Sequence, residues 1–499
     1  MIGRARLRDN VVANLAGTAV AAGVAVLSAP LIYRWMGAGA YGLVGVYVLL
    51  QTLMPLFDAG ITAGLARAVA WHRERSLGEV RTLVQAALRP IAALAVVFVF
   101  VAAFGADPLA RHWLGDSTIP FRTVRLALWW MAGALAVRLV AGLGRASLMA
   151  LELQSSANAV QAAAAVARTF GALLFAMATG TGVIGFFALQ VPISFAEYIA
   201  YQRALRRALP VEPMPVARAD LSRHLRFAFG IAGLSAMWLL TSQIDKALLA
   251  ESLRLRGYGA YSLGVHVASV ILLAVGSVHG AVLPRMTRHV AGQEEVKLGE
   301  LYGIATTLTV AMACAVVVAI AIGARMLVPS LRVSVDGIDP MRIAWLYGIG
   351  NAGAALLAMA YQLQNARGVL RMHAIGTVLQ MLVQVPLVAW SASGGDAVRT
   401  AVMFAFVNWA FALVWLPFVH ARFLPGGHWR WMSRHLLPAL VTGVVIGTAA
   451  IHVAHALPGG WVWGVVALAC GTGTTFAAAV SMDADARVVV KTWMGAHAS

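Results

Sequence analysis

The chain carries little charge for its length, and this excludes most soluble folds. Only 12% of its 499 residues are charged, whereas 61% are hydrophobic. A soluble domain usually carries about a quarter charged residues, because its surface must face water. The hydrophobic excess must therefore face lipid, and the composition predicts an integral membrane protein.

Cysteine and the common catalytic motifs are also scarce. Cys314 and Cys470 lie in separate hydrophobic runs, so they form neither a zinc cluster nor a disulfide framework. None of the three lysines follows a glycine, which excludes the G-K-[ST] phosphate loop of ATPases. HExxH and GxSxG are absent too. We therefore expect a protein that is not an enzyme and that holds no metal or cofactor.

The positive charge comes almost entirely from arginine. The net charge is +18, yet only Lys246, Lys297 and Lys491 are lysines. Most arginines lie in short loops between hydrophobic runs, which is the pattern of cytoplasmic loops in membrane proteins. The chain has no recognised nucleic-acid motif, and we expect no nucleic-acid partner.

The hydrophobic runs predict an all-α membrane fold with about fourteen spanning helices, since each crossing needs about 20 apolar residues. The predicted spans are residues 11–33, 41–66, 83–104, 124–149, 157–178, 182–203, 226–250, 258–283, 299–323, 342–365, 372–391, 398–420, 435–455 and 459–480. With the N-terminus inside, the inner segments hold 23 Arg and Lys residues and the outer loops hold 10. This bias predicts that both termini are cytoplasmic.

A short internal repeat divides the chain. Residues 34–41 (RWMGAGAY) match residues 254–261 (RLRGYGAY) at five of eight positions, 220 residues apart. The repeat predicts two parallel six-helix lobes followed by two further helices. The expected boundaries are residues 1–210 for the first lobe, 211–430 for the second, and 431–499 for the last two helices and a cytoplasmic tail. A proline- and arginine-containing linker near residue 210 supports the division.

Two arginines lie deep inside predicted spans. Arg138 and Arg168 are about ten residues or more from either end of their spans, too far for their side chains to reach the interface readily. A charge at the bilayer centre costs about 2.5–3.5 kcal/mol, so such residues usually face a protein interior or a wet cavity. Arg145 shares a helix face with Arg138. The three could form a cationic wall that binds phosphate, or they could pair with Asp58 or Glu197.

Other charges in the spans have weaker assignments. Arg145, Glu197 and Lys246 lie near span ends, where reaching the interface explains them equally well. Asp245 and Lys246 are adjacent, and we expect them to take different partners. Asp58 follows Pro55, which should kink the helix, and it is a candidate proton or cation site.

Neutral polar residues also recur within the spans. They could hydrogen-bond a sugar in a wet cavity, or equally could join neighbouring helices. The predicted polar lining consists of Asn14, Gln243, Asn351, Gln380 and Gln384.

Several segments resemble one family of bacterial transporters. They are NLAG at 14–17, PLIYRWMG at 30–37, FDAGI at 57–61, QIDK at 243–246, GAYS at 259–262 and VLPR at 282–285. In this order they resemble the O-antigen and exopolysaccharide repeat-unit flippases of the multidrug/oligosaccharidyl-lipid/polysaccharide exporter superfamily. The resemblance is strongest in spans 1, 2, 7 and 8, and little is recognisable beyond span 10.

The resemblance implies two helical bundles around a central cationic cavity. It implies a polyprenyl-pyrophosphate oligosaccharide, moved to the outer leaflet of the bacterial inner membrane by alternating access and driven by a proton or sodium gradient. Membrane lipids and polysaccharide polymerase or assembly proteins would be partners. The pyrophosphate would meet Arg138 and Arg168, with Arg145 and Lys246 nearby, and Asp58, Asp245 or Glu197 would couple the ion.

Other functions remain open. A drug or cation exporter of the same superfamily would share the fold, although its cavity should be dominated by acids. Here five cations and three acids lie within the spans when the first and last two residues of each span are left out. A lipid II flippase is closer in chemistry, but its N-terminal arginine-rich pattern is not apparent. A membrane polymerase or ligase should have large outer loops, and this chain has none.

Overall fold

The computed structural model describes residues 7–113, 119–210, 239–326, 334–457 and 461–495, apart from residues 59 and 74, and a few isolated positions between 212 and 237. These residues are almost entirely helical, with one isolated bridge between Val335 and Ile338. Within them, twelve helices are long and apolar enough to cross a membrane. The all-α membrane fold predicted from the sequence is confirmed.

Twelve of the fourteen predicted spans correspond to these helices, to within a few residues for most. The predicted span 11–33 lies within a described helix, although most of its side chains lie outside the described part, and residues 239–250 of the predicted span 226–250 are described as helix. The short loop predicted between residues 178 and 182 is present, and Gly180 adopts φ 66° in it. The connection predicted between residues 455 and 459 falls largely on residues 458–460, which lie outside the described part.

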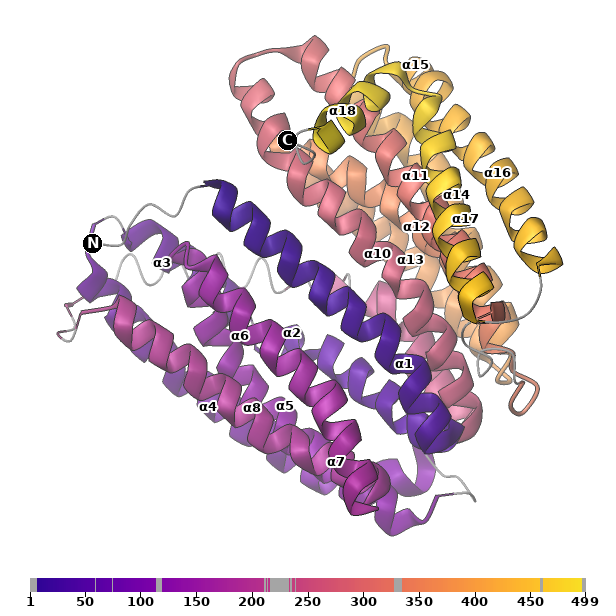
Figure 1. Cartoon of the computed structure of the whole chain (residues 1–499). Helices are drawn as coiled ribbons and strands as arrows, with labels where there is room; N and C mark the ends of the chain where they lie inside the picture. The colour runs from indigo at the N-terminus through magenta and orange to yellow at the C-terminus, as the bar shows by residue number, and fades with distance from the viewer. Residues whose placement is uncertain are drawn as a thin grey trace. The chain divides into compact units, whose positions relative to one another are not determined.

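The chain separates into two compact units, Met1–Gly259 and Ala260–Ser499, whose helices are labelled in Figure 1. The described helices of the first unit are α1 (Leu7–Thr52), α2 (Met54–Phe57), α3 (Ile61–His72), α4 (Leu77–Pro108), η1 (Leu109–Trp113), α5 (Phe121–Ala150), α6 (Gln154–Val166), η2 (Ala167–Gly171), α7 (Ala172–Thr179) and α8 (Gly182–Ala208). Residues 239–252 are also helical.

The second unit contains most of α10 (Arg254–Ala291), which begins in the first. It continues with α11 (Glu295–Met326), α12 (Pro340–Ala366), α13 (Arg371–Ala392), α14 (Ala397–Phe423), α15 (His428–Trp431), η4 (Met432–Leu436), α16 (Leu437–Ala456), α17 (Trp461–Ser481) and α18 (Ala484–Gly495). α16 and α17 pack against each other and against α11, outside the repeated part of the fold.

Both units repeat one order of helices. α4, α5 and α8 begin at residues 77, 121 and 182, and α11, α12 and α14 begin at 295, 340 and 397. α5 packs against α4 and α8, and α12 packs against α11 and α14 in the same way. The structure therefore repeats with nearly the spacing of the sequence match at residues 34 and 254. The predicted lobe boundaries at residues 210 and 430 stay predictions.

The predicted span 41–66 is broken as Pro55 led us to expect. α1 ends at Thr52, Pro55 lies in the first turn of the four-residue α2, and α3 begins only at Ile61. Proline cannot donate the hydrogen bond that would continue the helix. α1 itself is interrupted at Gly37, whose φ of 82° a glycine adopts without strain.

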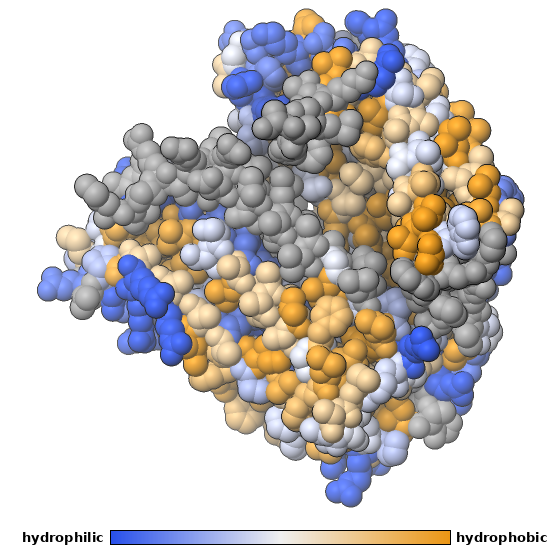
Figure 2. All heavy atoms as spheres, in the orientation of Figure 1, coloured by the Kyte–Doolittle hydropathy of each residue, from blue (hydrophilic) through white to orange (hydrophobic). Residues whose placement is uncertain are grey.

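The long helices expose apolar side chains where lipid would lie. On α4, Phe100 and Phe104 are 61% and 82% exposed, whereas Val80 and Ile91 are fully buried. On the face shown in Figure 2, hydrophobic surface covers much of the helical flanks, and the most hydrophilic residues gather near helix ends. This distribution is that of a multi-pass membrane protein.

Candidate substrate site

Arg138 lies midway along α5 and faces α1. Its guanidinium donates to Gln51 Oε1 at 2.5 Å and reaches Tyr47 Oη at 3.5 Å. Tyr47 and Gln51 are four residues apart, so they share one face of α1. Within the described residues Arg138 has no carboxylate partner within 4.0 Å, and its charge is met only by neutral oxygens.

Arg168 is buried and forms an ion pair with Glu197 of α8. The two side chains are only 11% and 7% exposed. Tyr201 donates to the other carboxylate oxygen of Glu197 at 3.4 Å. One of the two interpretations left open by the sequence, an ion pair between an intramembrane arginine and Glu197, is therefore correct for Arg168.

The arginines expected to form a cationic wall lie in one electrostatic neighbourhood. Arg168 is close enough to Arg138 to interact with it electrostatically, and Tyr201 interacts with both Arg145 and Arg168. Arg145 also donates to Gln161 Oε1 of α6 at 2.8 Å. Among the described residues only Arg168 of the three arginines pairs with a carboxylate, Glu197, so the cluster retains excess positive charge inside the spans.

The helix that carries Arg168 is locally widened around it. Residues 167–171 form a single π-helical turn between α6 and α7, a feature that often occurs at functional sites. Such a turn leaves a backbone carbonyl without its usual helical partner. Here the buried Gln190 amide donates to the Arg168 carbonyl oxygen at 2.7 Å, so α8 supports the distorted turn.

A polar stripe on α8 was missed by the sequence analysis. Gln190, Ser194, Glu197 and Tyr201 recur at helical spacing, and all four are buried. Gln190 Oε1 and Ser194 Oγ have no hydrogen-bond partner. Buried polar atoms normally have partners, so these two are available to a ligand or to water. The spacing of 4, 3 and 4 residues was visible in the sequence, but Glu197 alone attracted notice.

Asp58 has a structural contact that the sequence did not predict. Its Oδ1 accepts the Gly60 backbone N–H at 2.6 Å, where the chain turns between α2 and α3. An aspartate that accepts the backbone N–H two residues further on stabilises a turn. Asp58 is only half-buried at this position. The structure thus gives Asp58 a role in the turn that precedes α3, and ion coupling there stays a prediction.

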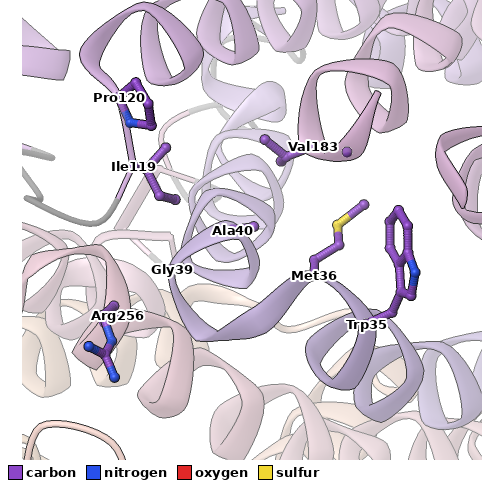
Figure 3. A pocket seen from close by; sticks show the side chains of 9 residues that line it. Trp35, Met36, Gly39, Ala40, Ile119, Pro120, Val183 and Arg256 are labelled. Atoms are coloured by element: carbon purple, nitrogen blue, oxygen red, sulfur yellow. The ribbon is translucent and has the colours of Figure 1, made fainter. Parts of the chain in front are cut away.

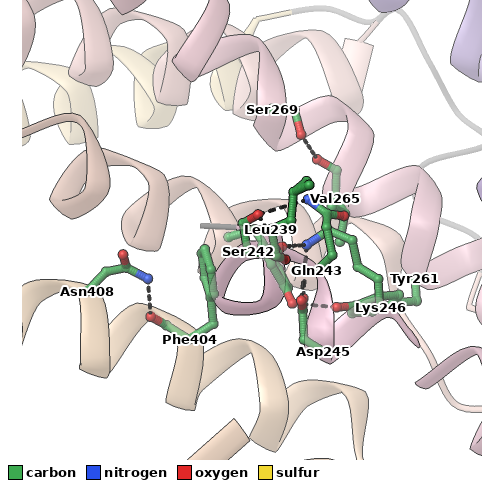
Figure 4. Close-up of polar contacts among 11 residues, drawn as sticks. Leu239, Ser242, Gln243, Asp245, Lys246, Tyr261, Val265, Ser269, Phe404 and Asn408 are labelled. Carbon is green, nitrogen blue, oxygen red and sulfur yellow. Dashed lines mark hydrogen bonds and ion pairs between the residues drawn. The ribbon is translucent and has the colours of Figure 1, made fainter. Parts of the chain in front are cut away.

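The adjacent residues Asp245 and Lys246 contact each other, contrary to our expectation of separate partners. Lys246 Nζ lies 3.1 Å from Asp245 Oδ1 and donates to the Ser242 carbonyl oxygen at 2.6 Å (Figure 4). The long lysine stem curls back along its own helix, so neighbouring side chains meet. Gln243 donates to Ser242 Oγ at 3.3 Å, which places three of the predicted site residues in one polar segment.

The predicted polar lining of the second unit mostly joins helices. Asn351 donates to the Ala268 carbonyl oxygen at 3.0 Å. Gln380 donates to Gln384 Oε1 at 3.2 Å and to Asn408 Oδ1 at 3.3 Å. Asn408 in turn donates to the Phe404 carbonyl oxygen of its own helix (Figure 4). These contacts favour the packing interpretation of these residues over sugar binding. The side chain of Asn14 lies outside the described part.

A cavity of about 520 Å³ in the first unit lies away from the arginine cluster. Figure 3 shows it at the break in α1 and the beginnings of α5 and α8, with Arg256 at one side. Its lining residues are Trp35, Met36, Gly39, Ala40, Ile119, Pro120, Gly182, Val183 and Arg256. Arg138 and Arg168 lie mid-helix, so this cavity is not the cationic site. Within the described residues, no group of three metal-ligating side chains converges.

A family model described as "Polysaccharide biosynthesis protein" matches residues 7–290, which is more than half of the chain. Among curated protein sequences none matches the chain.

Solved structures of several transporters share the fold. The lipid II flippase MurJ, in an inward closed conformation, aligns with a TM-score of 0.69 at 11% identity, covering 95% of this chain and 98% of that one. An inward-facing multidrug resistance MATE family transporter of the MOP superfamily gives a TM-score of 0.66 at 14% identity, covering 82% and 94%. A MOP superfamily transporter from Pyrococcus furiosus, described as having reversed pocket polarity, gives 0.60 at 13% identity, covering 83% and 95%. At these identities the likeness shows the fold alone.

Proposed function

The chain belongs to the family of polysaccharide biosynthesis proteins, and from this premise we propose that it is a flippase for lipid-linked oligosaccharides. The transported molecule is a glycan repeat unit on a polyprenyl pyrophosphate, moved from the cytoplasmic to the outer leaflet of the bacterial inner membrane. The sugar is the part that lipid excludes most strongly, and the pyrophosphate supplies negative charge for the protein to bind.

The observation that carries the proposal is the arginine cluster of the first unit. Arg138, Arg145 and Arg168 lie within spanning helices, and Glu197 is the carboxylate paired with the cluster. A planar guanidinium matches the oxygens of a pyrophosphate, and a low local dielectric strengthens the attraction. A cavity for organic cations would need the opposite balance of charge.

Arg138 is the first contact we assign to the pyrophosphate. It already has neutral partners, so it can bind an anion without first breaking an ion pair. Arg168 is different, because Glu197 occupies it. When substrate is bound, a phosphate oxygen replaces the Glu197 carboxylate as the partner of Arg168.

The exchange at Arg168 suggests how transport couples to an ion. When the pyrophosphate takes over Arg168, the buried Glu197 loses its cation and keeps only Tyr201 as a polar partner. An unpaired buried carboxylate is costly, so a proton binds Glu197 as the substrate binds. Asp58 and Asp245 remain the alternative coupling residues, and sodium remains the alternative ion.

The experiment is reconstitution into liposomes with a polyprenyl-pyrophosphate oligosaccharide, scoring glycan access to an outside reagent with and without a proton or sodium gradient. We expect protein-dependent exposure that a gradient accelerates. No exposure with several such lipids, together with exchange of organic cations, would contradict the proposal and indicate a drug exporter. Glycan chain growth without exposure would instead indicate a polymerase.

A further inference from the structure

Two buried polar atoms of α8, Gln190 Oε1 and Ser194 Oγ, have no hydrogen-bond partner within the described part. Gln190 and Ser194 are 2% and 0% exposed. A buried helical serine commonly donates to the carbonyl four residues before it, as the equally buried Ser147 of α5 does to Leu143 at 2.8 Å. Ser194 makes no such bond. Because an unpaired buried polar atom costs free energy, we expect both atoms to find partners in another state of the protein.

The two residues lie in line with Glu197 on one face of α8. Ser194 precedes Glu197 by three residues, and Gln190 precedes Ser194 by four, which are the spacings of neighbouring side chains on a helix. Helical side chains lean toward the N-terminus of their helix, so Glu197 leans toward Ser194 and Ser194 leans toward Gln190. Tyr201 shows the same lean, because its hydroxyl donates to Glu197 Oε1 at 3.4 Å.

One additional proton would join these groups into a chain of hydrogen bonds. Gln190 Oε1 and ionised Glu197 only accept, and the hydroxyl of Ser194 supplies the single proton between them. A proton on Glu197 Oε2, the oxygen that now pairs with Arg168, would donate to Ser194 Oγ. The Ser194 hydroxyl would then donate to Gln190 Oε1. The chain ends at the Arg168 carbonyl oxygen, which already accepts from Gln190 Nε2 at 2.7 Å.

We propose that Ser194 and Gln190 are positioning residues that hold the proton taken up by Glu197 during transport. This inference rests on the proposed exchange, in which the pyrophosphate takes Arg168 from Glu197. One proton from solution then binds Glu197 Oε2, while Tyr201 keeps Oε1. The completed chain ties the protonated carboxyl to the backbone of the π-helical turn 167–171. It thereby holds this turn in place while the Arg168 guanidinium binds the pyrophosphate.

Among the described residues around Glu197, no other group can take this proton. The surrounding charged and titratable side chains are Arg168 of η2, Arg138 and Arg145 of α5, Tyr47 of α1 and Tyr201 of α8 itself. α6 and α7 also pack against α8 but contain no ionisable side chain. Arginines stay charged and neutral phenols already carry their proton, so the proton binds the carboxylate.

Ser194→Ala and Ser147→Ala test the chain. Each removes the hydroxyl of a fully buried serine in the first unit, but only Ser194 lies beside Glu197. Farnesyl pyrophosphate is added to each detergent-solubilised protein over a range of pH, and a pH-sensitive dye measures proton uptake. In Ser194→Ala, the pH above which binding takes up no proton should fall by about one unit, because the protonated form loses one hydrogen bond. Ser147→Ala should match the unaltered protein.

The outcomes separate this inference from the proposed function. A purely structural role of Ser194 would lower the unfolding temperature of Ser194→Ala without moving the pH limit of proton uptake. That result, or an equal shift in both serine variants, would overturn the inference alone. Binding by the unaltered protein without proton uptake would also overturn it and leave pyrophosphate recognition intact. Failure of the unaltered protein to bind farnesyl pyrophosphate would contradict the proposed function and this inference together.

Discussion

The buried pair of Arg168 and Glu197 is the residue-scale feature on which both stability and function depend. Breaking a buried ion pair by removing one partner leaves an uncompensated charge, typically at a cost of about 3–5 kcal/mol. Removing Glu197 should cost more than removing Arg168, because Glu197 also offsets the repulsion between Arg138 and Arg168.

We predict that Arg168→Gln lowers the unfolding temperature of the purified protein, because Glu197 is then buried without a full counter-charge. The Arg168→Gln/Glu197→Gln double variant should recover much of the loss, since two neutral amides can hydrogen-bond. Thermal unfolding in detergent, followed by circular dichroism, measures both. Equal stability of Arg168→Gln and the unaltered protein would show that the pair contributes little.

Glu197 also has a functional prediction. If it takes up a proton when pyrophosphate displaces it, adding farnesyl pyrophosphate, a soluble prenyl pyrophosphate, to the detergent-solubilised protein should remove protons from weakly buffered solution and raise its pH. A pH-sensitive dye reports the change. Glu197→Gln should bind the ligand without the pH change. Binding by the unaltered protein with no pH change would show that Glu197 does not take up a proton when substrate binds, and ion coupling would then belong to another residue.

At the scale of elements, Asp483 joins three helices. It accepts from Thr307 of α11 and His435 of η4, and from the Ala486 N–H at the start of α18. Burial acts to raise the pKa of this carboxyl, but these hydrogen bonds outweigh it and lower the pKa from 3.8 to about 2. The ionised carboxylate is thus the form that holds α18 in place.

This shift predicts a dependence of stability on acid. A carboxyl whose pKa is lower in the folded state stabilises the fold at pH above about 4, and the contribution disappears as the pH falls toward 2. Asp483→Asn should therefore remove part of the difference in unfolding temperature between pH 6 and pH 3. An unchanged difference would mean that Asp483 does not contribute to the acid sensitivity.

The break between α2 and α3 is the other element-scale feature. The turn hydrogen bond of Asp58 predicts that Asp58→Ala costs about 1 kcal/mol, whereas Asp58→Asn keeps the accepting oxygen and most of the stability. Unfolding temperature tests this contact. The same Asp58→Asn protein, reconstituted in liposomes, tests ion coupling: lost dependence on the gradient in a stable variant would assign the coupling ion to Asp58.

At the scale of the whole molecule, the sequence predicted the helices well. Each span needs a long apolar run, and helices that face lipid keep this run free of charged residues, as the middle of α4 does. Pro55 marked a kink because the backbone effect of proline acts locally. The repeat was visible from the match between residues 34–41 and 254–261, and the equivalent helices begin at nearly the same spacing.

The partners within the site were less predictable. The pairing of Arg168 with Glu197 depends on packing between helices distant in sequence, for which no local pattern exists. The turn contact of Asp58 with Gly60 could not be recognised until the position of the helix break was known. The π-helical turn at Arg168 has no sequence signal that we recognise, although the polar stripe of α8 could have indicated a buried polar site.

The arginine bias between loops predicts the orientation of the whole chain. With Cys314 and Cys470 replaced by alanine, Ser393→Cys in the predicted outer loop should react in intact cells with a membrane-impermeant thiol reagent. Gln293→Cys in the predicted inner loop should react only after permeabilisation. Both residues are exposed and lie between spanning helices. The reverse labelling would place the termini outside and invert the direction assigned to transport.

The most direct test of the central claim compares glycan flipping in liposomes by Arg138→Gln and by Arg122→Gln. Both arginines lie on α5, but Arg122 is exposed at its beginning and Arg138 belongs to the intramembrane cluster. Losing a charged hydrogen bond to pyrophosphate should slow flipping about tenfold or more in Arg138→Gln, with Arg122→Gln unaffected. Unimpaired flipping by a well-folded Arg138→Gln protein would contradict the claim that this cluster binds the substrate.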